Sequence, residues 1–239
     1  MKIIDKKENQ ITFMVEMSES LANAIRRYIN QIPVLAVDEV EIYKNDSPLY
    51  DETVAHRIGL IPLKMDKAVS EKTEMQMKLS VKGEGPVYSG QFEGALGVVY
   101  DKIPITTLGP EGELQVVATA RTGRGSEHSK FSPGLMYYRN VIEIKMDAEL
   151  HDKVKEKLPD NEVRKDGKSI IVFDNLKTDI TDACEEICRE EGKTLEIIPK
   201  NELVITLESF GQIPVEDIFK KAVAALEKDL ETAAKLAGK

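Results

Sequence analysis

The sequence predicts an α+β fold in which helices near both ends of the chain flank a central region of strands. Apolar residues alternate with a period of two over 11–15, which is typical of a strand with one buried face. Helical periodicity covers 18–32 and 214–236, while three strand-like stretches separated by Gly and Pro clusters lie within 75–146. With 239 residues, 41% of them hydrophobic, the chain is long enough to bury a core in one large or two medium domains.

The charge balance and the N-terminal residues exclude several classes of protein. A formal net charge of -9 argues against broad nucleic-acid binding, because phosphate contacts need clustered Lys and Arg, so we expect no direct DNA binding by the isolated chain. Residues Met1 to Asp5 lack the features of a signal peptide, and no apolar run approaches the roughly 20 residues that span a bilayer. We therefore expect a cytoplasmic protein without a membrane partner.

The first helix has one apolar and one polar face. Ser18 or Ser20 offers an N-cap, and Pro33 ends the helical pattern. The apolar stripe consists of Leu21, Ile25, Tyr28, Ile29 and Ile32. The opposite face consists of Asn23, Arg26, Arg27 and Asn30, and the residues alone leave open whether it is merely solvated or binds a partner.

A strand pair or one bent strand is predicted next, over 34–43, followed by a turn at 46–48. Asp51 is predicted to cap a short helix that ends at Gly59 as a left-handed C-cap. The clearest strands of the central region are 75–81, 113–120 and 141–146.

The polar segment 147–168 is predicted to be a linker or domain boundary. A βαβ-like stretch follows. Its predicted elements are a strand at 170–173, a helix capped by Asp179 or Thr181 that runs through Glu191 and is ended by Gly192, and strands at 194–198 and 202–208.

The last helix carries a wide apolar stripe. Its members recur at helical spacing and are Ile218, Phe219, Ala222, Val223, Leu226, Leu230, Ala233 and Leu236. Such a face must be buried, and packing on the chain's own domain and packing on a partner are equally compatible with the pattern.

Catalytic chemistry has little support in this sequence. His56, His128 and His151 are scattered and belong to no nucleophile, metal or phosphate motif, so no catalytic residue is expected. The Gly-rich segment 122–126 lacks the Lys-Ser/Thr ending and the following helix of a P-loop, which favours a hairpin or loop.

Cys184 and Cys188 lie one helical turn apart. Two thiolates alone make an incomplete iron-sulfur or zinc site, and an i, i+4 helical spacing is too wide for an undistorted disulfide. Structural thiols are the favoured interpretation, and no metal or cofactor is expected.

Several segments together resemble the RNA polymerase alpha family, in particular its archaeal branch, the counterpart of the eukaryotic third-largest subunit. The resemblance covers nearly the whole chain. It rests on LANAIRR (21–27) and IP (32–33), AVDEV (36–40), DE (51–52) with AHRIGLIPL (55–63), EHSKFSP (127–133) and ESFGQIPV (208–215).

This resemblance implies a domain organisation. A dimerisation domain would be built from residues 1–41 and 201–239, interrupted by a β-rich insert domain over 42–150 and by a small ferredoxin-like domain over 151–200.

The resemblance also implies partners. Leu21, Ile25, Tyr28, Ile218, Phe219, Ala222, Leu226 and Leu230 would form a heterodimer interface with the small alpha-like subunit L. Asn23, Arg26 and Arg27 match positions where the family meets a large catalytic subunit, and guanidinium groups suit such contacts because they bind carboxylates bidentately. Glu52, His56 and Arg57 would form a docking block toward the small subunits N and P.

The sequence departs from the family in its metal sites. Eukaryotic relatives carry a cysteine-rich zinc loop where residues 64–72 of this chain contain no cysteine. Many archaeal members carry iron-sulfur ligands spaced C-x2-C-x2-C-x3-C-P. When this chain is aligned with that pattern, Thr178 and Thr181 stand at the first two cysteine positions and Cys184 and Cys188 at the last two. Arg189 replaces the proline. Cys184 and Cys188 would thus be residual cluster positions in a domain that has lost its cluster.

The function implied is that of a non-catalytic assembly subunit of DNA-directed RNA polymerase, which pairs with L to form the platform for the large subunits. The alternative is a ferredoxin-like redox-sensing or electron-transfer protein that uses its cysteines. Direct promoter-DNA binding is a third class, which the acidic charge disfavours.

Overall fold

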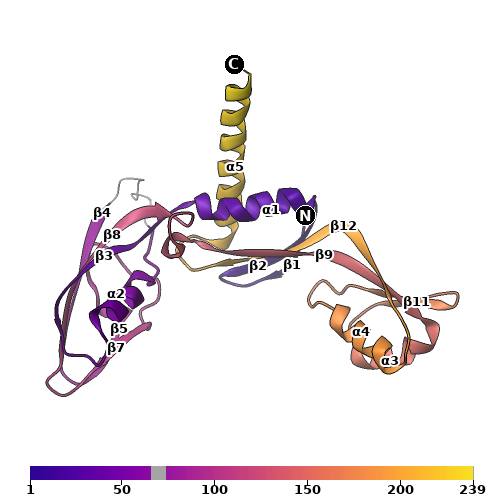
Figure 1. Ribbon diagram of the computed structural model, residues 1–239, viewed down its shortest axis with the longest axis horizontal. Coiled ribbons are helices and arrows are strands. Elements are labelled where there is room, and N and C mark those ends of the chain that lie inside the picture. The colour runs from indigo at the N-terminus through magenta and orange to yellow at the C-terminus, as the bar shows by residue number, and fades with distance from the viewer. Residues whose placement is uncertain (66–73, 239) are drawn as a thin grey trace. The chain divides into compact units, whose positions relative to one another are not determined.

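The computed structural model describes residues 1–65 and 74–238. Most of the cysteine-free segment 64–72 lies outside the described residues. The chain divides into two compact units. The first comprises Met1–Asn23 and Met136–Thr206, and the second comprises Ala24–Leu135 and Leu207–Lys239. Both helices and antiparallel strands are abundant (Figure 1), which confirms the α+β prediction in its coarse form.

The first unit is built on a six-stranded sheet, to which β9 and β12 contribute most of their length. The strand order is β1-β2-β12-β9-β11-β10. The strands are β1 (Lys2–Lys6), β2 (Gln10–Glu16), β9 (Gly134–Asp147), β10 (Val163–Asp166), β11 (Ser169–Phe173) and β12 (Glu196–Ser209). The strand predicted at 11–15 is confirmed as β2, in which Ile11 and Phe13 are buried. The exposed strand β1 was not predicted, because it buries none of its residues and so shows no alternation of apolar side chains.

The predicted linker at 147–168 is wrong. It folds into the 3-10 helix η4 (Ala148–Leu150), the helix α3 (His151–Lys157) and β10. Leu150 and Val154 are buried there, and Asn161 donates from Nδ2 to the Phe173 carbonyl oxygen at 2.8 Å. A helix of seven residues with one buried side chain is too short to show helical periodicity.

The helix predicted in this region is confirmed as α4 (Thr181–Glu190), and Gly192 follows it with φ +64°. Its predicted N-cap, Asp179 or Thr181, is wrong, because Ile180 holds the cap position and Thr181 is the first helical residue. It packs into an apolar core with β9, β11 and α3. That core consists of Ile144, Met146, Leu150, Val154, Ile170, Val172, Ile180, Cys184, Ile187 and Cys188. The two strands predicted beyond Gly192 are one continuous strand, β12, because Pro199 fits an extended backbone.

The division between the units falls within α1 (Glu19–Tyr28), which the 3-10 helix η1 (Ile29–Gln31) extends. Ser18 is the N-terminal cap, since its Oγ accepts from the Leu21 backbone N–H at 3.3 Å. Of the two predicted caps, Ser18 and Ser20, Ser18 is therefore the correct one.

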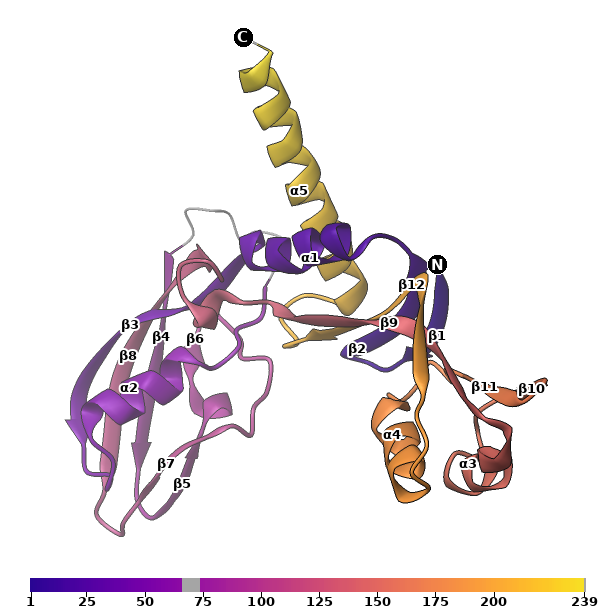
Figure 2. The same cartoon turned by 45° about the vertical axis from the view of Figure 1, so that its right-hand side comes forward.

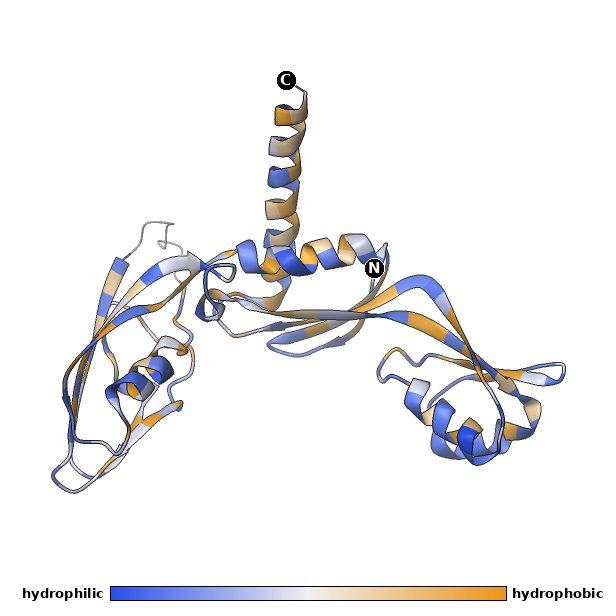
Figure 3. Cartoon of the chain, viewed as in Figure 1, coloured by the Kyte–Doolittle hydropathy of each residue, from blue (hydrophilic) through white to orange (hydrophobic). Residues whose placement is uncertain are grey.

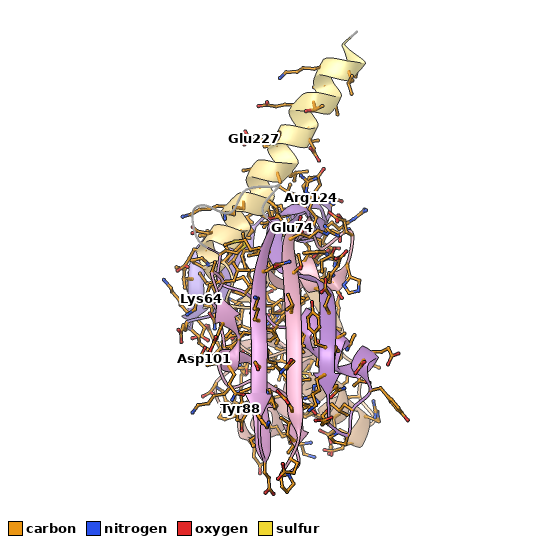
Figure 4. All side chains as sticks on the ribbon, turned by 90° about the vertical axis from the view of Figure 1, so that its left-hand side faces the viewer. Lys64, Glu74, Tyr88, Asp101, Arg124 and Glu227 are labelled. Atoms are coloured by element: carbon orange, nitrogen blue, oxygen red, sulfur yellow. The ribbon has the colours of Figure 1, made fainter. Side chains whose placement is uncertain are left out.

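The second unit contains a four-stranded sheet in the order β3-β8-β4-β6. Its strands are β3 (Pro33–Asn45), β8 (Glu113–Arg124), β4 (Glu74–Lys82) and β6 (Glu93–Gly94). Register shifts between Val37 and Glu39 and between Ile42 and Lys44 bend β3, so the alternative of one bent strand is the correct one. In Figure 4 the long strands β4, β8 and β3 run side by side, and none of the described helices of this unit covers the face turned to the viewer.

The other face of this sheet is covered by α2 (Asp51–Gly59) and by the ribbon of β5 (Gly85–Tyr88) and β7 (Pro104–Leu108), as Figure 2 shows. The 3-10 helices η2 (Ser89–Gln91) and η3 (Ser129–Phe131) lie in the connections. Both predicted caps of α2 are wrong: Tyr50 precedes the helix as N-cap, and Leu60 ends it in a right-handed conformation. Asp51 and Gly59 are helical residues, because Tyr50 already has the extended backbone that a cap requires.

The segment 122–126, predicted to be a hairpin or loop, is the end of β8 and the turn after it. A Cβ at Gly123 would lie 2.7 Å from the Phe131 ring, so close packing explains this glycine.

The terminal helix α5 (Val215–Ala237) begins after Pro214, as predicted. Its first turns pack against the body of the second unit through Ile218 and Ala222, which are fully buried. Every described residue from Glu227 onward is exposed. In Figures 1 and 3 this part of α5 projects from its unit and carries apolar residues along its length.

Candidate functional site

The projecting part of α5 leaves an apolar stripe uncovered. Val223, Leu230 and Leu236 are exposed, with Leu230 at 61%, and Leu226 is half-buried. Charged residues Glu227, Lys228 and Glu231 occupy the other side of the helix, by helical spacing. An isolated helix of this length is marginal in water, and a contiguous exposed apolar stripe is typical of a protein–protein contact. The geometry therefore favours a partner along α5.

The predicted interface residues divide into two groups. The first group is buried within the chain itself and consists of Ile25 on α1 and of Ile218 and Ala222 in the first turns of α5. Leu21 and Leu230 are exposed, while Tyr28, Phe219 and Leu226 are half-buried. The first turns of α5 thus pack on their own unit, and the rest of the apolar stripe is not covered by the chain's described residues. The assignment to a heterodimer stays a prediction.

A hydrogen bond joins α1 to α5 beside this stripe. Tyr28 Oη donates to Asp229 Oδ2 at 3.0 Å, and the bond to this carboxylate raises the pKa of Tyr28. Asp229 lies on the apolar side of α5, so this exposed bond links the two helices beside the stripe.

The polar face of α1 presents Asn23, Arg26 and Arg27, and all three side chains are exposed. Both arginines lie in the last turn of the helix, where a positive charge complements the helix dipole. The face can receive carboxylates or backbone carbonyls from another protein.

The short helix α2 presents Glu52, His56 and Arg57 to solvent, while Val54 and Ile58 bury its other side completely. Arg57 Nη2 donates to the Pro104 carbonyl oxygen at 2.7 Å, which ties the helix to β7. The three predicted docking residues therefore share one exposed helix.

Sequence reasoning missed a charged network beside α2. Asp38 accepts from Arg121 Nε and from Lys130 Nζ, each at 2.7 Å, and these cations lower the pKa of Asp38. His56, His128 and Lys130 line the same small hollow as Asp38. The only signal in the sequence was that the segments 36–40 and 127–133 both carry the family resemblance.

The two thiols lie in the apolar core of the first unit and do not fit a cluster site. Burial raises the pKa of Cys184 to about 12 and also raises the pKa of Cys188. The corresponding residues Thr178 and Thr181 carry hydroxyls, which are poor substitutes for thiolate ligands. In the described ranges 1–65 and 74–238, no three His, Cys, Asp or Glu side chains form a group that could hold a metal ion.

Cys184 is expected to be inert while the chain is folded. At pH 8 its reaction with iodoacetamide should be roughly a thousandfold slower than in the denatured chain, because the thiolate is the reactive form. Mass spectrometry after timed alkylation measures this ratio. Equal rates in the two states would contradict the burial.

The same thiol makes stability depend on pH in the alkaline range. The folded-state pKa of about 12 lies above the ordinary value of 9.0, so its stabilising contribution is complete below pH 9 and is lost as pH rises toward 12. Cys184→Ala should flatten this part of the stability curve in urea unfolding.

In the described part of the chain, no helix combines the length and the apolar character required to cross a membrane.

Comparison with known proteins identifies relatives along nearly the whole chain. Residues 40–142 match the model of the RNA polymerase Rpb3/RpoA insert domain. DNA-directed RNA polymerase subunit Rpo3 of Pyrococcus horikoshii is 35% identical, over 94% of this chain and 92% of the relative. The subunits of the same name from Thermococcus kodakarensis, 34% identical over 94% and 92%, and from Archaeoglobus fulgidus, 30% identical over 96% and 94%, are similar throughout as well.

Proposed function

The chain belongs to the family of archaeal DNA-directed RNA polymerase subunit Rpo3, and we propose that it is a non-catalytic assembly subunit of that enzyme. The observation that carries the proposal is the apolar stripe of α5, which the chain's own residues leave open beyond Ala222. A subunit whose task is assembly needs such an open surface, whereas an enzyme needs a concave site with convergent reactive groups.

The partner along α5 is the small alpha-like subunit L. Leu226 and Leu230 form the centre of the contact, with Leu21 and Tyr28 contributed by α1. The wide apolar stripe suits helix-to-helix packing, in which residues three and four apart interdigitate with a partner helix. The resulting pair is the platform on which the other subunits assemble.

Two polar surfaces receive the remaining partners. The face of α1 that carries Arg26 and Arg27 contacts a large catalytic subunit, and its exposure supports this role. The block on α2 with Glu52, His56 and Arg57 receives the small subunits N and P. Its support is that all three side chains are exposed on one anchored helix.

The first unit includes a ferredoxin-like fold that has lost its cluster and is held by its apolar core. In this proposal residues 151–200 form that domain, residues 42–150 form the insert domain, and 1–41 with 201–239 form the dimerisation domain. The redox alternative has no support, since both thiols are buried and the relatives are polymerase subunits.

Stepwise reconstitution tests the proposal. The chain is first mixed with subunit L, and the resulting pair is then titrated with a large subunit. Arg27→Ala should leave folding and pairing with L intact, because Arg27 is exposed, but should weaken recruitment of the large subunit by about tenfold or more. Glu227→Ala, on the charged side of α5, is the matched control and should leave recruitment unchanged.

If the pair that carries Arg27→Ala recruits the large subunit as well as the unaltered pair does, the polar face of α1 is not the contact with that subunit. A pair that recruits no large subunit even with the unaltered chain would contradict the assembly function itself.

A further inference from the structure

A groove of about 380 Å³ in the second unit brings together segments that are far apart in the sequence. Leu60 and Pro62 follow α2, Tyr100 and Ile103 precede β7, and Phe210 lies in the turn after β12. The η3 segment closes the groove with Ser129 and Lys130. Three stretches singled out by the sequence, 55–63, 127–133 and 208–215, therefore meet at one place on the surface.

Large apolar side chains in this groove remain exposed. Leu60 is 51%, Tyr100 41% and Phe210 43% exposed. A single exposed apolar residue is ordinary, but three that line one groove form a patch of the kind that marks interaction sites.

Hydrogen bonds hold the turn that carries Phe210. Ser209 Oγ donates to the Ile213 carbonyl oxygen at 2.5 Å and accepts from the Gly211 N–H at 2.9 Å. Gln212 Nε2, which is buried, donates to the Leu35 carbonyl oxygen at 3.0 Å. These bonds hold the backbone of the turn, so Phe210 lies at the groove before any partner arrives, which lowers the entropic cost of binding.

Gly211 explains how the turn comes so close to Tyr100. Its φ is +91°, and a Cβ there would lie 2.7 Å from the Tyr100 hydroxyl oxygen. Glycine alone accepts this positive φ and also leaves room for the Tyr100 ring. The close approach brings Phe210 and Tyr100 together in the lining of the groove.

The charge on the described lining of the groove is already ion-paired. Lys130 is the charged side chain among the described residues that line it, and its Nζ lies 2.7 Å from Asp38 Oδ1. A charged side chain placed in the groove would lose hydration without gaining a free counter-charge, which disfavours charged occupants.

We propose that this groove binds an uncharged apolar segment of another polymerase subunit, with Leu60, Tyr100 and Phe210 as its anchors. The inference rests on the proposed assembly function and deepens it. Because Leu60 ends α2, the groove continues the polar docking block with an apolar contact, and the two together recognise one partner surface.

Site-specific cross-linking in the assembled polymerase tests the inference. Phe210 is replaced by the photoreactive p-benzoylphenylalanine, and the cross-linked peptide is identified by mass spectrometry. The same group at Leu135, which is as exposed as Leu60 at 51% but does not line the groove, is the control. Position 210 should react with an apolar, uncharged segment of another subunit that position 135 does not reach.

A second substitution checks that the groove carries the contact. Leu60→Glu should lower the yield at position 210 by roughly tenfold to a hundredfold, because it introduces a charge next to an apolar anchor, whereas Leu60→Met should preserve it.

Assembly without a cross-link at 210, or with a cross-link to a charged segment or to this chain itself, would overturn the groove inference alone. A chain that never enters the polymerase would overturn the proposed function and the groove inference with it.

Discussion

Leu226→Glu combined with Leu230→Glu is expected to abolish pairing with subunit L, weakening it by more than about a hundredfold, because two carboxylates would be buried against an apolar partner. Both residues lie on the stripe of α5 that the chain does not bury fully. The free chain should still fold, because Leu230 is exposed and Leu226 is only half-buried. Analytical ultracentrifugation of mixtures with L measures the affinity.

The matched control changes the opposite side of the same helix. Glu227→Gln with Glu231→Gln alters two exposed positions of α5 and should leave the affinity for L nearly unchanged. If both double variants pair equally well with L, the stripe is not the interface.

Asp174→Ala is expected to destabilise the first unit by about 1–3 kcal/mol, because it removes charge-assisted hydrogen bonds from a side chain that is 1% exposed, while Arg139, 26% exposed, stays partly hydrated. The Asp174 side chain is 1% exposed and binds the guanidinium of Arg139 through both oxygens. It also accepts from the Leu176 N–H at 2.7 Å, and Leu176 has φ +65°, a strained value for leucine. The substitution removes both the ion pair with Arg139 and the hydrogen bond that holds the Leu176 backbone.

Urea unfolding with a probe in the first unit measures this loss. Asp152→Ala is the control, because Asp152 also contacts a basic side chain but is fully exposed, and it should leave the unfolding midpoint nearly unchanged. A similar small effect for Asp174→Ala would show that the pair with Arg139 contributes little.

Long, periodic elements could be predicted from the sequence. The stripe of α5 recurs along the whole helix, and β2 alternates clearly, so both appeared in the expected places. Short elements could not: α3 and β1 bury too few side chains to show a period. The caps of α2 were predicted one residue too far inside the helix. Asp51 and Gly59 are residue types that favour cap positions, but Tyr50 and Leu60 occupy those positions.

The candidate site was predictable where it lies on a single helix. The exposed faces of α1, α2 and α5 follow from helical spacing. The groove could not be derived this way, since Leu60, Tyr100 and Phe210 are brought together only by tertiary packing. The burial of Ile218 and Ala222 within the chain is likewise a tertiary result, which periodicity leaves undecided.

The assembly role is tested most directly by the molar mass of the chain co-expressed with subunit L, measured by size-exclusion chromatography with light scattering. A stable one-to-one heterodimer is expected, because the open stripe of α5 needs a partner. A monomer that elutes separately from L would contradict it, and would mean that α5 serves some purpose other than pairing.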